Sequence, residues 1–214
     1  APSAIRKTRS AKARLAGRTI DEHQREVSEL WATFAATAAG NPYAWSQVPY
    51  SPEEIRTPAA DNRVVTFPYL KRMCANIDVD EAAALLVCSY DLARDLGVPD
   101  DRLVFPLAAA DAHDRSFFSE RESLTASPTI AAAGSAALDE AGIGIDDVAR
   151  FDLYSCFPSA VEIALGALQL RGPGGGDPRP LTVTGGLGFA GGPANNYPTH
   201  AIAAMVDACR QDPG

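Results

Sequence analysis

The chain of 214 residues is 46% hydrophobic and 21% charged, which is enough to bury a core in one or two globular domains. Its net charge of -8 argues against general nucleic-acid binding, because phosphate contacts require a positive field. No apolar run approaches the roughly 20 residues that cross a bilayer, so we expect a cytoplasmic protein with no membrane segment.

The four cysteines show no Cys-x-x-Cys spacing, and a chain of this size does not need disulfides, which favours reduced thiols. His113 lies between Asp111 and Asp114, a grouping that fits a solvated turn better than a metal site. We therefore expect no metal and no resident cofactor.

The first 18 residues contain six basic side chains and no acidic one, so they could meet phosphate, although a solvated terminal segment is the favoured interpretation. Thr19 and Glu22 then have the spacing of a capping box. Apolar residues from Val27 to Phe34 recur on one helical face, and Gly40 ends the pattern. This pattern predicts a packed amphipathic helix.

Five prolines between residues 41 and 68 predict an ordered loop region with few backbone ladder bonds. We place a domain boundary near Asn62. Residues 1–61 would form the basic arm, the helix and this loop region, and residues 62–214 would form the carboxyl-terminal domain.

In that domain, the apolar run from Asp80 to Leu96 predicts a buried helix that ends at Gly97. Residues 102–109 suggest a strand with an edge or bulge at Pro106. Ser127 and the following proline begin an alanine-rich helix to residue 141.

The rest of the chain continues this alternation. It predicts short strands at 150–154 and 181–184, helices at 159–170 and 201–209, and a loop at 172–180. Alternating strands and helices predict an α/β fold, here a layered αβα domain with a mixed, five-stranded sheet.

The segment from Thr184 to Pro193 has five glycines and lies between a strand and a helix. Such a segment permits positive φ angles and close approach of a ligand to the backbone, although a tight structural turn explains it equally well. It lacks the glycine register of a dinucleotide site and the Lys-Ser/Thr ending of a P-loop.

A second segment, Asp152 to Pro158, runs from a strand into a helix and carries Cys156. The helix dipole would favour its thiolate, but a buried cysteine with a purely structural role explains the pattern equally well.

Together with a third segment, Cys74 to Ala84, these segments resemble the carboxyl-terminal half of the thiolase superfamily. The resemblance runs from Thr19 to Gly214 and is strongest to actinobacterial acetyl-CoA acetyltransferase or thiolase-like proteins related to sterol-carrier-protein thiolases. In thiolases, the segment that corresponds to Cys74 to Ala84 leads into Asp-Gly-Ala-Ala-Ala. Thiolases carry Asn-Glu-Ala-Phe where this chain has Tyr154 to Phe157. They carry Gly-His-Pro where it has Gly191 to Pro193.

The resemblance implies acyl-CoA binding in lipid or sterol-type acyl metabolism, with coenzyme A thioester as substrate or ligand. Gly192 stands where the family has its active-site histidine. Tyr154 replaces the asparagine or histidine that positions a catalytic water in the family. Acyl transfer is therefore expected only in altered form, with Cys156, Tyr154 and His200 as candidate catalytic residues.

The candidate substrate-binding residues are small or amide side chains of the glycine segment and the turn after it: Gly185, Gly186, Gly191, Gly192, Asn195 and Asn196. Arg63, Lys71 and Arg72 could reach a CoA phosphate, or could form a solvated face. The alternative is a non-catalytic subunit or degenerate half that completes a CoA site or dimer surface. In either case we expect a homo- or hetero-oligomer in which another chain supplies the amino-terminal thiolase half.

Overall fold

The computed structural model of the protein describes residues 17–170 and 178–212, so the predicted basic arm and most of the predicted loop at 172–180 lie outside it. The main elements, in chain order, are α2 (Ile20–Gly40), α3 (Pro52–Arg56), β1 (Val64–Thr66), β2 (Tyr69–Leu70), α4 (Tyr90–Asp95), α5 (Pro128–Ala141), α6 (Pro158–Ala167), α7 (Gly186–Phe189) and α8 (Tyr197–Gln211). Five short 3-10 turns lie between them among the described residues.

Helix α2 is the centre of the core and confirms the predicted amphipathic helix. Its first turn is closed by the predicted capping box, in which the Glu22 amide donates to Thr19 Oγ1 at 3.2 Å. Trp31 and Phe34 are each 1% exposed and stack with ring centroids 5.1 Å apart. This face packs against α3 and α7, so α2 joins the amino-terminal region to the glycine segment.

The side chain of Asn62 ties α3 to the chain that follows β2. Its amide donates to the carbonyl oxygens of Glu54, Ile55 and Thr57, at 3.0, 3.1 and 2.9 Å. Its oxygen accepts from the Arg72 amide at 3.0 Å. Asn62 is fully buried, so these four bonds satisfy a polar group that would otherwise be costly in the interior.

The predicted mixed sheet is not formed by the described residues, in which the regular sheet is the antiparallel pair β1–β2. Two of the expected strands lie side by side without a regular ladder. The Phe151 amide donates to the Pro180 carbonyl at 3.2 Å, and the Leu153 amide to the Leu181 carbonyl at 3.0 Å. The local sequence pattern therefore predicts extended segments here, but it does not identify the strands with which they would pair.

The predicted helix from Asp80 to Leu96 is wrong for most of its length. The chain is non-helical up to Ser89, whose side chain accepts from the Leu92 amide and begins the short helix α4. A run of alanine, leucine and valine with no polar face fits a buried strand as well as a buried helix, so periodicity does not separate the two. Leu86 is fully exposed in this segment.

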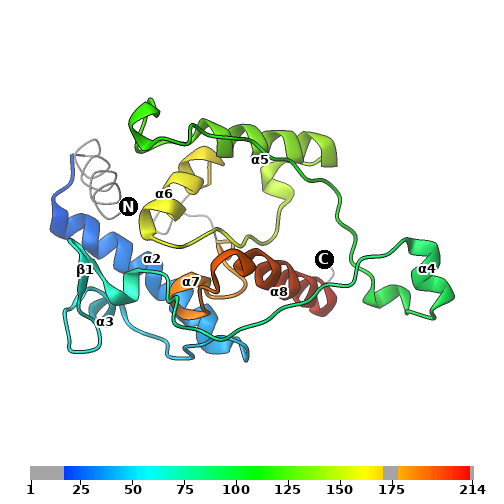
Figure 1. The fold of residues 1–214 in the computed structure, drawn as a ribbon, viewed down its shortest axis with the longest axis horizontal. Coiled ribbons are helices and arrows are strands. Elements are labelled where there is room, and N and C mark those ends of the chain that lie inside the picture. Colours follow the sequence, from blue (N-terminus) through cyan, green and yellow to red (C-terminus); the bar gives the residue numbers. More distant parts are fainter. Residues whose placement is uncertain (1–16, 171–177, 213–214) are drawn as a thin grey trace.

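The remaining helices follow the sequence signals. Helix α5 begins at the predicted proline and ends at Gly142, whose φ of 69° is the left-handed conformation typical of a helix end. Helix α8 runs from Tyr197 to Gln211 and includes the predicted helical residues 201–209. Figure 1 shows α5 and α6 on one side, α2, α7 and α8 on the other, and α4 at the far end of two long extended segments.

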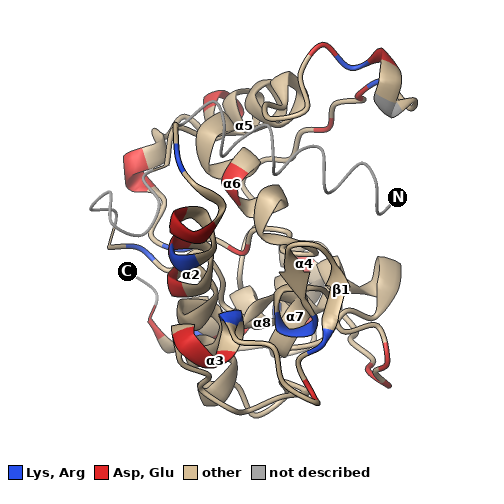
Figure 2. Ribbon diagram, turned by 90° about the vertical axis from the view of Figure 1, so that its left-hand side faces the viewer, with Lys and Arg blue, Asp and Glu red and all other residues tan. Residues whose placement is uncertain are grey.

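The charged side chains of α2 lie in its first half (Figure 2). They are four acidic residues and one basic residue: Asp21, Glu22, Glu26, Glu29 and Arg25. Within residues 17–170 and 178–212, no helix is both long enough and apolar enough to cross a membrane.

Replacement of Gly185 by alanine tests the contact between the glycine segment and α2. Gly185 has a φ of +102°, and a Cβ there would lie 2.3 Å from the Cβ and 2.5 Å from the Cα of Ala38. Backbone strain and overpacking together should lower the free energy of unfolding by about 3 kcal/mol. Urea denaturation followed by circular dichroism measures the change.

Gly166→Ala is the matched control, because a Cβ at this helical position meets no atom within 4 Å. It should leave stability unchanged or raise it by up to about 1 kcal/mol. Equal unfolding midpoints for the two variants would contradict the tight approach of Gly185 to α2.

Candidate functional site

The three segments that the sequence singled out meet in the structure. Residues 75 and 76 lie between the other two: the Ala75 amide donates to the Cys156 carbonyl at 3.0 Å, and the Asn76 amide donates to the Leu187 carbonyl at 2.9 Å. The Gly192 amide donates to the Asn76 carbonyl at 2.8 Å. The first segment therefore holds Cys156 and the glycine segment together.

The Asp152 carboxylate organises the entry to the glycine segment. One oxygen accepts from the Thr182 hydroxyl at 2.9 Å, the Val183 amide at 2.9 Å, and the Thr184 amide and hydroxyl at 3.0 Å each. The other oxygen accepts from the Tyr197 hydroxyl at 2.6 Å. Our sequence analysis gave Asp152 no role. The available signal was the pair of threonines directly before the double glycine, since hydroxyls and turn amides together suit a carboxylate.

Glycine is required in this turn by backbone conformation. Gly185, Gly186 and Gly191 have φ angles of 102°, 77° and 132°. Their segment uses many of its amides internally: Gly185 donates to the Thr182 hydroxyl at 2.9 Å and Gly186 to the Thr184 hydroxyl at 3.0 Å. The Gly192 amide also donates within the protein. The amides of Gly185, Gly186 and Gly192 are therefore not donors to a ligand in this structure.

Cys156 lies directly before the amino-terminal cap of α6, as the sequence predicted. Burial nevertheless raises the pKa of its thiol, although the amides of Phe157 and of Cys156 itself act in the opposite direction. Burial, with a smaller effect from Cys156, raises the pKa of Cys74 to about 11. Both groups are therefore neutral thiols near pH 7, so the helix dipole does not produce a reactive thiolate here.

Tyr154 is half-exposed and lies two residues before Cys156. The ring lies edge-on to Tyr197, with centroids 5.8 Å apart, and about half of the residue is exposed. Partial burial and the neighbouring Cys156 raise the pKa of the phenol. Tyr154 therefore remains a neutral hydrogen-bond donor over the physiological pH range.

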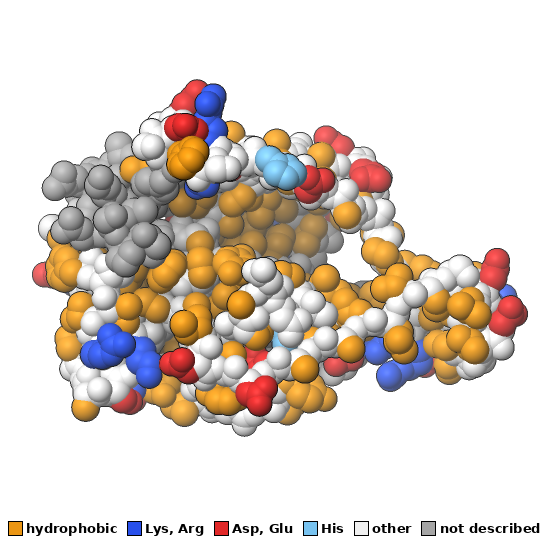
Figure 3. All heavy atoms as spheres, in the orientation of Figure 1, with side chains coloured by type: hydrophobic (Ala, Val, Ile, Leu, Met, Phe, Trp, Pro, Cys, Tyr) orange, Lys and Arg blue, Asp and Glu red, His pale blue; other side chains and the backbone are white. Residues whose placement is uncertain are grey.

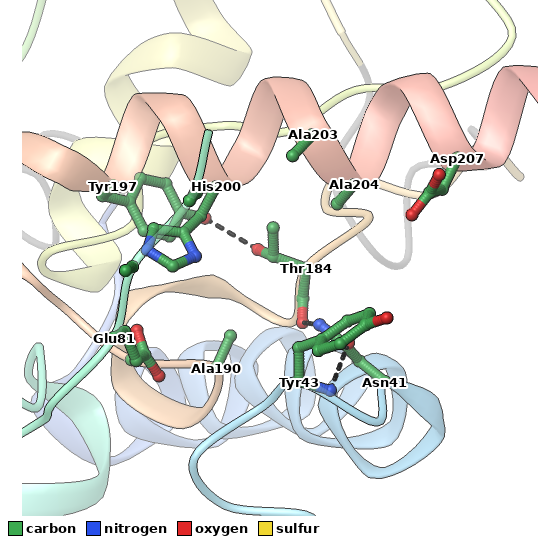
Figure 4. Close-up of a pocket in the computed structure, with 13 residues that line it drawn as sticks. Asn41, Tyr43, Glu81, Thr184, Ala190, Tyr197, His200, Ala203, Ala204 and Asp207 are labelled. Carbon is green, nitrogen blue, oxygen red and sulfur yellow. Dashed lines mark hydrogen bonds between the residues drawn. The ribbon is translucent and has the colours of Figure 1, made fainter. Parts of the chain in front are cut away.

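Tyr197, which contacts Tyr154, also lines a cavity of about 390 Å³ between α8 and the glycine segment. Figure 4 shows Tyr197 and His200 on α8, with Glu81 below His200 in the view and Thr184 along the wall. His200 Nε2 lies 3.3 Å from Asn196 Nδ2, and burial lowers the pKa of its ring. Asn195 is exposed at the turn before α8.

The candidate residues thus form two groups. Gly191 and His200 line the cavity, whereas Cys156 and Tyr154 are not among its lining residues. Glu81, which also lines the cavity, is a residue that sequence reasoning did not select.

Of the three basic residues considered for a CoA phosphate, Arg72 is held inside the protein. Its guanidinium donates to the Glu54 carbonyl at 2.8 Å and to the Asp61 carboxylate at 2.6 Å, and it lies 4.2 Å from the centroid of the Tyr50 ring. Arg63 and Lys71 are exposed. These two remain the candidates for contact with phosphate.

Alkylation with iodoacetamide at pH 7.5 tests the state of the thiols. The rise in the pKa of Cys74 from 9.0 to about 11 lowers its thiolate fraction about 100-fold. We expect the exposed Cys88 to react first, and Cys74 and Cys156 to react at least about tenfold more slowly, as measured by peptide mass spectrometry. In urea the rates should converge. Alkylation of Cys156 in the folded protein as fast as that of Cys88 would contradict the neutral thiol.

No protein-family model and no curated protein matches the chain. Among solved structures, it is similar to a monomeric SCP2-thiolase like protein type 1 from Mycobacterium smegmatis, with 38% sequence identity and a TM-score of 0.82 over 95% of this chain and 44% of the relative. It also shares its fold with the Ltp2-ChsH2(DUF35) aldolase, at 19% identity and a TM-score of 0.68 over 99% of this chain and 56% of that one.

The chain therefore spans less than half the length of the mycobacterial relative. The comparisons confirm the resemblance at the level of fold: the described chain has the fold of part of an SCP2-thiolase-like protein.

Proposed function

We propose that the protein binds acyl-CoA thioesters in lipid or sterol-type acyl metabolism. The observation that carries the proposal is the meeting of three segments around Asn76, within a fold that matches an SCP2-thiolase-like protein at a TM-score of 0.82. Segments distant in sequence converge there beside a cavity of a size that holds small ligands.

The chemistry of the group favours proton donation over nucleophilic attack. Tyr154 and Cys156 both have raised pKa values, so each keeps its proton at neutral pH. Neutral donors polarise a thioester carbonyl, whereas acyl transfer through cysteine requires a thiolate and a nearby base. We therefore propose that any reaction is altered from ordinary acyl transfer. The aldolase among the solved relatives supports carbon–carbon bond chemistry as the altered form.

The alternative is a non-catalytic subunit that completes a CoA site or a dimer surface. The internally bonded amides of Gly185, Gly186 and Gly192 favour it, because they leave no oxyanion site at those three positions. Both proposals include binding of a coenzyme A compound. Only the catalytic proposal includes turnover, so a measurement of turnover separates them.

Calorimetric titration with coenzyme A and with acetyl-CoA tests binding. Tyr154→Phe should weaken acetyl-CoA binding about fivefold to tenfold, the value of one hydrogen bond, and leave coenzyme A binding unchanged. Tyr90→Phe, a partly exposed tyrosine on α4, is the control and should alter neither. Failure of the wild type to bind either compound would refute the proposed function.

Turnover is measured in parallel as condensation of acetyl-CoA and as cleavage of a 3-hydroxyacyl-CoA. Cleavage that Tyr154→Phe abolishes would establish the catalytic proposal. Binding without either reaction would leave the non-catalytic subunit as the function.

We also infer that the extended segments around α4 pair with additional polypeptide of the thiolase-like type. Leu86 and Val87 are 103% and 87% exposed, and Leu107 is 70% exposed. Hydrophobic side chains gather along this arm in Figure 3. Such extended, apolar backbone is a template for strand pairing, and this chain spans only 44% of the mycobacterial relative.

Co-purification with a polypeptide that carries an amino-terminal thiolase half tests this inference. Leu86→Lys should abolish the association without lowering the stability of the chain alone, because the side chain is already in water. Ile202→Lys, at a half-exposed position on α8, is the control and should leave association intact. Retention of the complex by Leu86→Lys would refute the inferred surface.

A further inference from the structure

The cavity beside α8 is lined by small apolar side chains together with several polar ones. Its walls come from α8, the turn after α2, the segment that begins at residue 81, and the end of the glycine segment (Figure 4). Five of its lining residues are alanines: Ala82, Ala83, Ala190, Ala203 and Ala204. No lysine or arginine is among its described lining residues. The cavity therefore suits an uncharged aliphatic group better than a phosphate.

Glu81 reaches this cavity through the space that Gly191 leaves. A Cβ at Gly191 would lie 2.3 and 2.4 Å from the two carboxyl oxygens of Glu81, so any larger residue there would displace the carboxyl group. Among the residues that the structure describes, Glu81 Oε1 is buried and has no hydrogen-bond partner. A buried oxygen of this kind is costly unless it is protonated or meets a ligand.

The other polar groups of the cavity leave Glu81 free for such a ligand. The Tyr197 hydroxyl is bonded to Asp152 and Thr184, and the Asn41 amide donates to the Thr184 carbonyl at 2.9 Å. Asp207 lies on α8 within 3.6 Å of Arg210, and Tyr43 is largely exposed.

The surroundings of Glu81 favour its neutral form. Burial raises the pKa of Glu81 and lowers that of His200, so both groups shift toward their neutral forms. The titratable groups that face the carboxyl group across the cavity are His200, Asp207, Tyr43 and Tyr197, and none is a fixed cation that would stabilise its ionised form.

We propose that this cavity receives the acyl end of the thioester, and that protonated Glu81 donates a hydrogen bond to a carbonyl oxygen of the acyl chain. The proposal rests on the proposed function, because it assigns the acyl part of the same ligand. Tyr197 lines the cavity and its ring contacts that of Tyr154, so a thioester group at Tyr154 would lie next to an acyl end in the cavity. Gly192 has no side chain that could titrate. The Glu81 carboxyl group, which lies against the adjacent Gly191, places a titratable group next to that position.

A thioester without the nucleotide separates this proposal from CoA binding. The probe is the N-acetylcysteamine thioester of 3-oxohexanoate, titrated into the wild-type protein with alanine methyl groups labelled for NMR. We expect shifts of the Ala83, Ala203 and Ala204 methyl signals that saturate at millimolar concentration. Absence of these shifts refutes the acyl site, whatever the result of the coenzyme A titration; equally, a protein that binds the probe but not coenzyme A refutes only the proposed function.

Variants of Glu81 then test the donor. Glu81→Ala should weaken probe binding about fivefold to tenfold, and Glu81→Gln, which keeps a donor, should bind within about twofold of the wild type. Ala204→Leu, which fills the cavity without touching the carboxyl group, should also block the probe. Circular dichroism establishes that each variant is folded. Wild-type affinity in Glu81→Ala would overturn the role of Glu81.

The pH dependence distinguishes hydrogen bonding from packing. Wild-type affinity should fall as the pH rises through the raised pKa of Glu81, because ionisation removes the donor. Affinity of Glu81→Gln should be flat over that range, and His113→Gln, at an exposed histidine that is not among the cavity's lining residues, should retain the wild-type profile. A pH profile of Glu81→Gln identical to that of the wild type would refute proton donation by Glu81.

Discussion

The arrangement of the site depends on the carboxylate of Asp152. Five hydrogen bonds reach it from hydroxyls and amides, and they fix the two threonines before the glycine turn together with Tyr197 at the start of α8. Such charge-assisted bonds are roughly twice as strong as neutral ones. The threonine hydroxyls in turn accept from Gly185 and Gly186, so one side chain sets the path of the turn and the position of the next helix.

This construction explains why the site is poor in activated groups. Amides that could stabilise an oxyanion are used to hold the turn, and burial keeps Cys156 as a neutral thiol. What remains toward solvent and the cavity are two weak acids, Tyr154 toward solvent and Glu81 in the cavity lining. A set of neutral donors suits recognition of carbonyl oxygens, in keeping with the proposed thioester ligand.

Sequence reasoning located elements that carry their own signals. The capping box before α2 and the proline and glycine that bound α5 follow from local patterns. The three motif segments could be selected from the sequence, but the contacts that join them come from the fold. The failure at residues 80–89 has the opposite cause, because an apolar run takes its conformation from the partners that cover it. Asp152 and Glu81 were missed because their roles arise from distant contacts, with Tyr197 and with Gly191, that no spacing along the chain reveals.

Residues 75 and 76 have a mechanical consequence. They are fastened on both sides, to Cys156, Leu187 and Gly192, and a few residues later the same strand of chain becomes the exposed arm that leads to α4. Glu81, in the cavity lining, therefore lies between these fixed residues and the exposed arm. If a partner binds the arm, as proposed above, a shift of the arm would act on residues 75 and 76, which hold Cys156 and the glycine segment together. Partner binding and the shape of the cavity would then be coupled.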